Sequence, residues 1–194
     1  MATRYTCHMG GELDQRALHW INDWPDWLEP VMLFFTNGTN YLIVKIGLAL
    51  LVLGMILRGG KARLGAVHAL LAFPLANEIT DAFKRNLPVE RPFQALEWVL
   101  VRGGLESESM GTASAHSANM AAVAFAFTAA LGWRWGLPWI LAALLTGLSR
   151  IYVGVHFPSQ VILGWACGVF AGMVIVYTYR AWQRRRDLRE AQPA

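Results

Sequence analysis

The chain has 194 residues, 55% of them hydrophobic and only 15% charged, and a formal net charge of +4. This length permits one domain, and the hydrophobicity is high for a soluble domain of this size. Most of the basic excess stands beside apolar runs, where Lys and Arg set the orientation of membrane helices. We therefore expect no nucleic-acid partner and interpret the chain as a membrane protein.

Residues 1–39 form an N-terminal segment that we expect to lie at the membrane surface. Residues 1–12 lack the apolar core of a signal peptide. Residues 13–35 mix three tryptophans with several acidic residues, which predicts one or two amphipathic interfacial helices. Cys7 and Cys167 stand in very different settings, so we expect neither a disulfide bond nor a metal site from them.

Five apolar runs follow, each of which can form a membrane-spanning helix with its flanking residues. In chain order they are Asn40–Leu57, Leu64–Phe83, Ser117–Leu131, Leu137–Leu148 and Val161–Tyr179. In the last run Gly164, Gly168 and Gly172 recur every fourth residue, which indicates a close helix contact. The sequence therefore predicts an all-α integral membrane bundle of about five transmembrane helices, forming one membrane-embedded domain over residues 1–194.

Lys and Arg residues are unevenly distributed between the two ends of these helices. They cluster in the turn after the first run and in the basic tail, residues 180–194, which the positive-inside rule places in the cytoplasm. The long connection between the second and third runs then faces outward, and in it residues 93–102 predict a short interfacial helix. Pro158 suits the first turn of the fifth helix. Cations on the outward side need a separate reason to exist.

Three helix ends on the outward side carry residues that can perform chemistry. At the end of the second run Lys84 shares a helix face with Asp81, and Arg91 follows in a loop bounded by prolines. The third run begins with Thr112 or Ser114 as a helix cap, where free N–H groups favour an anion. The fourth run ends in an arginine, and a histidine follows six residues later. Together these ends supply Lys84, Arg91, Ser114, His116, Arg150 and His156.

Each of these residues alone has a common structural explanation. A lysine at a helix end often extends to the membrane surface, an arginine can end a helix, and a single histidine is more often structural than catalytic. Six of them on one face are harder to explain in this way. Three permanent cations, a helix N-terminus and two histidines suit phosphate, because arginine binds its oxygens in pairs and histidine can attack phosphorus or donate a proton.

The order and spacing of these residues resemble the three motifs of the type 2 phosphatidic acid phosphatase superfamily, which also includes vanadium haloperoxidases. The stretch KRNLPVERP gives Lys, six residues and Arg-Pro. ASAH occupies the place of Pro-Ser-Gly-His, and SRIYVGVH gives Ser-Arg, five residues and His. The motif region extends from Lys84 to Gln160, and the helical layout extends the resemblance over most of the chain.

The resemblance implies a phosphatase that needs no metal ion and no other cofactor. Carried onto this chain, it makes His156 the nucleophile that forms a phosphohistidine. It makes His116 the general acid, which then serves as the base for water. It assigns the phosphoryl oxygens to four side chains and one backbone N–H, those of Lys84, Arg91, Ser114 and Arg150 and that of Ala115.

Three positions depart from the family pattern. Ala113 replaces proline, and Ala115 replaces glycine. Where the family usually has an aspartate, four residues after the nucleophile, this chain has Gln160. Glutamine can accept a hydrogen bond from the His156 ring but supplies no negative charge. We therefore count it among the catalytic residues as a weakened substitute for the acid.

The sequence leaves three functions open. The first is hydrolysis of a phosphomonoester or diphosphate of a membrane lipid, with undecaprenyl diphosphate as the first choice. The others are phosphoryl transfer between lipids and a catalytically impaired lipid-binding or lipid-translocating protein, which Gln160 favours. We expect a phosphorylated lipid and the bilayer as partners, a site on the outer face of the cytoplasmic membrane and a cytoplasmic C-terminus. No sequence feature specifies the oligomeric state.

Overall fold

The computed structural model describes residues 10–105 and 109–191, so Cys7 lies outside the described residues. All regular elements of these ranges are helical: α1 (Glu12–Asn22), η1 (Asp26–Leu28), α2 (Glu29–Asn37), η2 (Gly38–Asn40), α3 (Leu42–Arg58), α4 (Gly60–Asn86), α5 (Pro92–Ala95), α6 (Ala115–Leu131), α7 (Trp133–Tyr152) and α8 (Pro158–Glu190). The expected all-α bundle is confirmed. The five apolar runs correspond to α3, α4, α6, α7 and α8.

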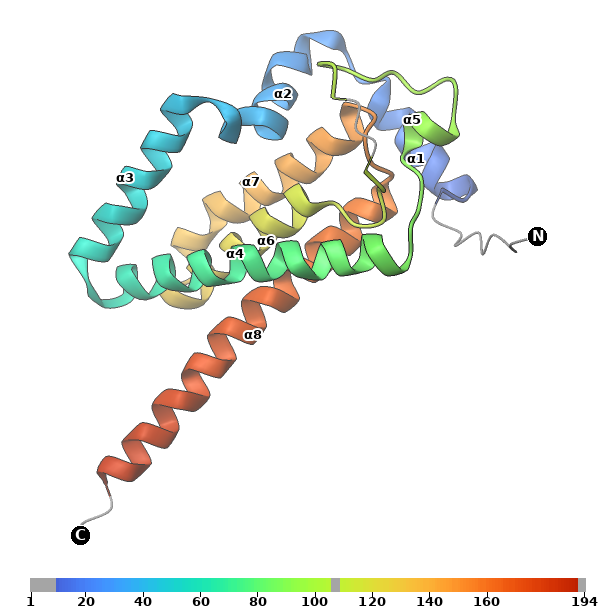
Figure 1. The fold of residues 1–194 in the computed structure, drawn as a ribbon. Helices are drawn as coiled ribbons and strands as arrows, with labels where there is room; N and C mark the ends of the chain where they lie inside the picture. The colour runs from blue at the N-terminus through green and yellow to red at the C-terminus, as the bar shows by residue number, and fades with distance from the viewer. Residues whose placement is uncertain (1–9, 106–108, 192–194) are drawn as a thin grey trace.

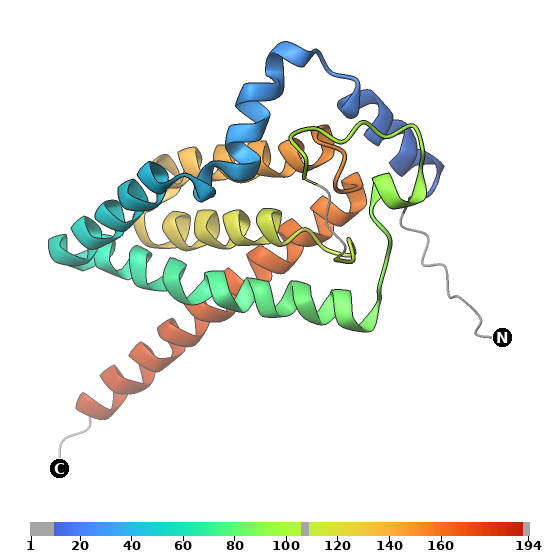
Figure 2. The same cartoon turned by 45° about the horizontal axis from the view of Figure 1, so that its top comes forward.

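The central helix of the bundle is α6, which packs against α4, α7 and α8 (Figures 1 and 2). The glycines of α8 permit a very close approach to α6. A Cβ on Gly168 would lie 2.0 Å from a backbone oxygen of Ala118, and one on Gly164 would lie 2.5 Å from that of Ser114. The close helix contact expected from the glycine spacing is therefore confirmed. It holds the N-terminus of α6 against the first turns of α8.

A second core lies where α1 and α2 cover the turn between α7 and α8. Its buried side chains include Leu18, Ile21, Met32, Val155 and Phe157. At the end of α1 the buried Asn22 donates to the carbonyl oxygens of Leu100 at 2.9 Å and Tyr152 at 2.8 Å. The N-terminal segment is thereby fixed onto the α7–α8 turn.

Only part of residues 93–102 is helical, so the expectation of a helix over this segment is wrong. The helix α5 ends at Ala95, and the chain continues without regular structure toward the α7–α8 turn. Contacts with the N-terminal segment favour this course. The backbone N–H of Leu100 donates to the Asn22 side chain at 3.0 Å, and the buried Arg102 donates to the Asn22 carbonyl oxygen at 2.7 Å. These tertiary bonds replace those that a helix would make.

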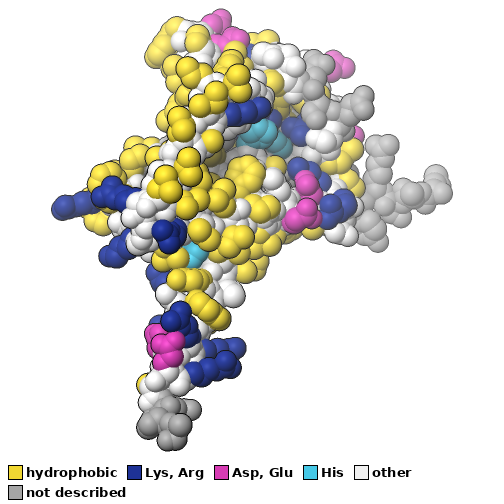
Figure 3. Space-filling view, turned by 60° about the vertical axis from the view of Figure 1, so that its left-hand side comes forward, with side chains coloured by type: hydrophobic (Ala, Val, Ile, Leu, Met, Phe, Trp, Pro, Cys, Tyr) yellow, Lys and Arg dark blue, Asp and Glu magenta, His cyan; other side chains and the backbone are white. Residues whose placement is uncertain are grey.

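The helix α3 stands apart from the bundle (Figure 1). None of its residues is buried, and its main contacts are with α4 and η2. Between α3 and α4 lies an apolar pocket of about 500 Å³, lined by Leu48, Ala49, Val52, Leu53, Ile56 and Leu70. Hydrophobic side chains cover much of this face (Figure 3). An apolar surface of this extent suits contact with lipid chains.

By length and composition, fewer helices qualify as membrane spans than the sequence led us to expect. Within the described ranges α8 qualifies alone, and the segments Asp26–Asn40 and Leu42–Arg58, bent by 64°, would together make a second span. The apolar α6 has only 17 residues, and α4 and α7 carry charged residues toward their ends. The number of about five transmembrane helices therefore stays a prediction.

Candidate active site

The residues that the motifs indicate meet at one end of the bundle. The α7–α8 turn carries His156, the last turn of α7 carries Arg150, and the loop before α5 carries Arg91. The α6 N-terminus and the first turn of α8 are joined by a hydrogen bond from the Ser114 N–H to the Gln160 carbonyl oxygen at 3.0 Å. Lys84, in the last turn of α4, completes the group expected from the sequence.

His156 is buried, and both of its ring nitrogens have neighbours. Nδ1 lies 2.9 Å from Oε1 of Gln160 and 3.2 Å from the carbonyl oxygen of Gly111. Nε2 lies 3.3 Å from Nη1 of Arg91. Gln160 therefore stands where the family pattern requires the group that orients the nucleophile.

The contacts of the Gln160 amide determine which nitrogen of His156 carries the proton. Oε1 of Gln160 accepts from the Phe157 N–H at 3.2 Å, and Nε2 donates to the Glu90 carbonyl oxygen at 3.1 Å. This orientation makes both neighbours of His156 Nδ1 acceptors, so Nδ1 carries the hydrogen. Nε2 then keeps its lone pair and faces a donor on Arg91. The neutral ring thus presents an unprotonated Nε2 toward Arg91.

Burial lowers the pKa of His156 well below its usual value of 6.5. The positive charges of Arg150 and Arg91 lower the pKa of His156 further, and the hydrogen bond that His156 donates to Gln160 raises it. With glutamine at position 160, no carboxylate in this orienting place stabilises the imidazolium. The low pKa therefore keeps the His156 ring neutral above pH 6.5.

Arg91 is buried, and every hydrogen bond that the structure assigns to its guanidinium is made with an uncharged group. Nε donates to the Ser109 carbonyl oxygen at 2.7 Å, Nη2 to the Ser109 hydroxyl at 2.8 Å and Nη1 to the Val155 carbonyl oxygen at 3.1 Å. These bonds fix the plane of the guanidinium beside the His156 ring. They leave its charge without a counterion in the described part of the chain.

Arg150 is buried as well, and its Nε has no hydrogen-bond partner. No carboxylate among the described residues pairs with its guanidinium. The backbone carbonyl oxygen of Arg150 accepts from the His156 N–H at 3.2 Å, which ties the two residues into one turn. Because burying an unpaired charge is costly, the two arginines form a site that an anion would complete.

The remaining expected residues, His116 and Lys84, differ in exposure and in their contacts. His116 is exposed and lies within electrostatic range of Lys84, Arg91 and Arg150. Lys84 donates to Asp81 at 3.0 Å, so its direction is set by that carboxylate. Histidine and basic side chains are visible together in a hollow on the face that α3 borders (Figure 3). This end of the bundle is therefore open to a ligand.

Ser114 caps α6, as the sequence predicted for this position or Thr112. Its Oγ accepts from the Ser117 hydroxyl at 2.9 Å and from the Ser117 N–H at 3.4 Å, so its own hydroxyl hydrogen is left to donate. Ala115 is the first residue of α6, where a backbone N–H has no partner within the helix. Both groups can donate to an anion at this helix end.

Two residues that support the site, Gly111 and Ser109, were not predicted from the sequence. The Gly111 carbonyl oxygen faces His156, and a Cβ at this glycine would lie 2.8 Å from Oε1 of Gln160 and 3.0 Å from Cγ of Arg91. Only a glycine allows the loop this close. Backbone carbonyl oxygens carry no signature in a sequence, so neither contact could have been predicted.

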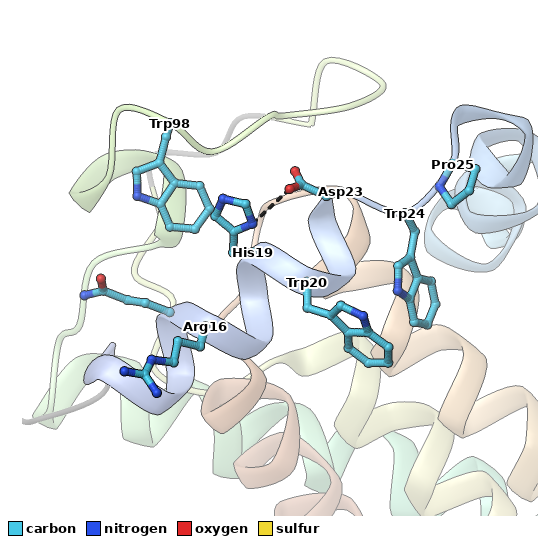
Figure 4. A pocket seen from close by; sticks show the side chains of 8 residues that line it. Arg16, His19, Trp20, Asp23, Trp24, Pro25 and Trp98 are labelled. Carbon is cyan, nitrogen blue, oxygen red and sulfur yellow. Dashed lines mark ion pairs between the residues drawn. The ribbon is translucent and has the colours of Figure 1, made fainter.

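The larger pocket, of about 690 Å³, lies elsewhere, on α1 (Figure 4). Its charged groups are already paired: His19 contacts Asp23 at 2.8 Å and Arg16 pairs with Glu12. The ring of His19 stacks at 5.0 Å from that of Trp98. Three tryptophans line this pocket, which suits the headgroup level of a bilayer. None of the residues that the three motifs indicate lines this pocket.

The chain is similar in sequence to proteins of one family. Residues 65–184 match the PAP2 superfamily. A bacitracin transport permease protein BcrC from Bacillus licheniformis is 28% identical over 173 residues, covering 86% of this chain and 81% of that protein. An undecaprenyl-diphosphatase from Sulfolobus acidocaldarius is 26% identical over 151 residues, covering 77% of this chain and 69% of that protein.

Two solved structures share the fold. Aquifex aeolicus LpxE superimposes with a TM-score of 0.71 at 24% identity, covering 85% of this chain and 95% of that one. A transmembrane PAP2-type phosphatidylglycerolphosphate phosphatase from Bacillus subtilis gives a TM-score of 0.66 at 19% identity and covers 89% of each chain. Since the family match includes more than half of the chain and all three motif regions, this protein belongs to the PAP2 superfamily as a lipid phosphatase.

Proposed function

We propose that the protein hydrolyses the diphosphate of a polyprenyl lipid, undecaprenyl diphosphate in the first place, through a phosphohistidine intermediate. The observation that carries this proposal is the pair of buried arginines, Arg91 and Arg150, which have no carboxylate partner among the described residues. A phosphoryl group supplies the missing negative charge, and guanidinium groups bind its oxygens in pairs. The neutral His156 beside them is the nucleophile.

The proposed reaction has two steps. In the first, Nε2 of His156 attacks the terminal phosphorus and the bond to the bridging oxygen breaks. Desolvation and the nearby cations lower the pKa of His116 to about 4 in the free protein, and the negative charge of the bound diphosphate raises it, so that His116 is protonated and gives its proton to the leaving lipid phosphate. In the second, His116 takes a proton from water, which attacks the phosphohistidine and releases inorganic phosphate. Both phosphoryl transfers build up charge on oxygens that Arg91, Arg150 and the α6 N-terminus are placed to stabilise. A phosphoryl oxygen would also compete with Nε2 for the Arg91 N–H, freeing the lone pair.

Three features support a lipid diphosphate as the substrate. Lys84 adds a third cation at the edge of the site, which suits the extra charge of a diphosphate. The apolar pocket between α3 and α4 offers a place for a hydrocarbon chain. One relative carries the name undecaprenyl-diphosphatase. We assign the phosphate groups to the cationic end of the bundle and the prenyl chain to the face that α3 borders.

The same proposal includes the organisation and orientation of the chain. Residues 1–194 form one membrane-embedded domain, with residues 1–39 at the outer interface and the basic tail, 180–194, in the cytoplasm. The site then faces the outer side of the cytoplasmic membrane. The distribution of Lys and Arg supports this orientation.

Gln160 favours a second candidate, a phosphatase fold that binds a phosphorylated lipid with little turnover. The test is release of inorganic phosphate from a panel of phosphorylated lipids in detergent, with a chelator present. Hydrolysis predicts one phosphate released for each substrate consumed. If the phosphoryl group is transferred to another lipid, substrate is lost without an equal release of inorganic phosphate. If the protein is catalytically impaired, it binds the lipid, but no substrate is lost and no phosphate is released. Activity confined to phosphomonoesters would overturn the choice of a diphosphate.

A further inference from the structure

The first turn of α8 carries Gln160, yet the residue that precedes this helix cannot cap it. Phe157 has no polar side-chain group, and Pro158, the first residue of α8, has no backbone N–H. The first N–H that needs an acceptor belongs to Ser159. Its partner comes from the other end of the sequence.

Asp14 of α1 supplies this acceptor across 145 residues. Oδ1 accepts the Ser159 backbone N–H at 2.9 Å, and Oδ2 accepts the Ser159 hydroxyl. Oδ2 also accepts the Gly10 N–H at 3.0 Å, which orients the carboxylate. An acidic side chain at a helix N-terminus is favoured both by these hydrogen bonds and by the helix dipole. Asp14 is therefore the N-terminal cap of α8, supplied by a different helix.

Attachment of α1 does not depend on this contact. The other end of α1 is held by the buried side chains of Leu18 and Ile21 and by Asn22, which binds the backbone of Leu100 and Tyr152. The Asp14 carboxylate is a separate contact, made at the residue that directly precedes Gln160. What it fixes is the first turn of α8.

A fixed first turn of α8 matters more for Gln160 than it would for an aspartate at the same position. A carboxylate would hold the imidazole by charge as well as by geometry, whereas Gln160 holds it by one neutral hydrogen bond of 2.9 Å. A small rotation of the first turn of α8 would exchange or lengthen that bond and release the Nδ1–H form of His156. Resting on the proposed function, we propose that Asp14 is a positioning residue for the reaction: by capping α8 from α1 it keeps Gln160 aligned with His156.

The first experiment compares steady-state kinetics of phosphate release from undecaprenyl diphosphate in detergent. Asp14→Ala should lower kcat about fivefold with little change in KM, since a lost cap corresponds to about 1 kcal/mol and the loss falls on the transition state. Ser159→Ala, which keeps the N–H bond, should lower kcat less. Asp23→Asn is the matched control, because Asp23 directly follows the same helix and its carboxylate pairs with His19, away from α8. It should behave as the parent does.

The second experiment separates positioning from general destabilisation. In a Gln160→Ala background there is no side chain left to align, so Asp14→Ala should lower kcat no further. An equal loss from Asp14→Ala in both backgrounds would overturn the proposal, because it would mean that Asp14 acts independently of Gln160.

A spectroscopic readout does not depend on turnover. In protein labelled with ¹⁵N at its histidine rings, the parent should give the Nδ1–H form of His156, and Asp14→Ala should give a mixture of the two neutral forms. An unchanged His156 spectrum in Asp14→Ala would also refute the positioning role. If no lipid is hydrolysed by the parent, the proposed function fails, and this spectrum still decides the role of Asp14.

Discussion

The side-chain oxygen of Gln160 lies 2.9 Å from Nδ1 of His156, and the same oxygen accepts the backbone N–H of Phe157. A neutral amide thus occupies the orienting position of a histidine nucleophile. Its orientation is fixed from the other side by the Glu90 carbonyl oxygen. The hydrogen bond that the proposed nucleophile needs is present, while the negative charge of an aspartate at this position is missing.

Replacing this amide by a carboxylate should increase the rate. Gln160→Asp should raise kcat for phosphate release by about tenfold, because an acid would stabilise the positive charge that develops on His156 and about 1.4 kcal/mol corresponds to a factor of ten. The measurement is the initial rate on the substrate that the lipid panel identifies. A slower Gln160→Asp variant would show that the glutamine is not a weakened substitute for an acid.

The dependence of activity on pH should reflect the low pKa of His156. Because burial and two arginines lower this pKa well below 6.5, the ring stays neutral and nucleophilic in mildly acidic solution. The acid limb of kcat/KM should therefore lie well below pH 6.5 in the parent. In Gln160→Asp the new carboxylate favours the imidazolium, so the acid limb should move to higher pH. A shift in the opposite direction would contradict the assigned role of residue 160.

The two histidines should differ when each is replaced. His156→Ala should abolish turnover and the phosphoenzyme together, because no other side chain at the site is placed to carry the phosphoryl group. His116→Ala should accumulate an acid-labile phosphohistidine, since a lipid phosphate leaves without much help while water still needs a base. Rapid quenching with ³²P-labelled diphosphate lipid measures both. Label retained in His156→Ala would show that the nucleophile is another residue.

Activity should persist in a chelator and be inhibited by vanadate. The groups assigned to phosphate are guanidinium, ammonium and N–H donors, which do not coordinate Mg²⁺. Vanadate should compete because it can adopt the five-coordinate geometry of phosphorus during transfer. Phosphate release measured with EDTA, with added Mg²⁺ and with vanadate tests this. Loss of activity in EDTA that a divalent ion restores would count against the proposed site.

The orientation of the chain can be tested independently of catalysis. A reporter fused after Ala194 should behave as cytoplasmic, and one inserted at Gly103, in the connection before α6, should behave as external. Fluorescent and alkaline-phosphatase reporters give opposite signals on the two sides. The reverse pattern would place the site in the cytoplasm and exclude an outward-facing substrate.

Much of the fold could be predicted because local sequence signals determine it. Ser114 caps α6, Pro158 begins α8, and the spacing of the α8 glycines gives the close contact with α6. The segment after α5 could not be predicted, because contacts with Asn22 and Arg102 determine its path. The separation of α3 from the bundle was equally invisible, since a lipid-facing helix and a packed helix have the same apolar composition.

The site, like the fold, contains residues that the sequence predicts and residues that it does not. Residues that react or carry charge, such as His156, Arg91 and Arg150, stand in motifs whose order and spacing can be read directly. The groups that hold them are backbone atoms or distant residues, such as the Gly111 carbonyl oxygen and the Asp14 carboxylate. Asp14 is separated from Ser159 by 145 residues and lies in a segment that looked purely interfacial. Only the folded chain brings such pairs together.

Because α3 stands apart from the bundle, its side chains can change in evolution more freely than those of the packed helices. A helix with no buried residue imposes almost no packing requirement on its side chains, so their size and shape can change without disturbing the arginines and histidines at the end of the bundle. Under the proposed function, in which the prenyl chain lies on the face that α3 borders, selection for a different hydrocarbon length can act on α3 while the phosphate chemistry is inherited unchanged. This can be tested with a chimera in which Leu42–Arg58 is replaced by the corresponding helix of a relative. The chimera should prefer a lipid with a different hydrocarbon length, and the pH dependence of its activity should be unchanged.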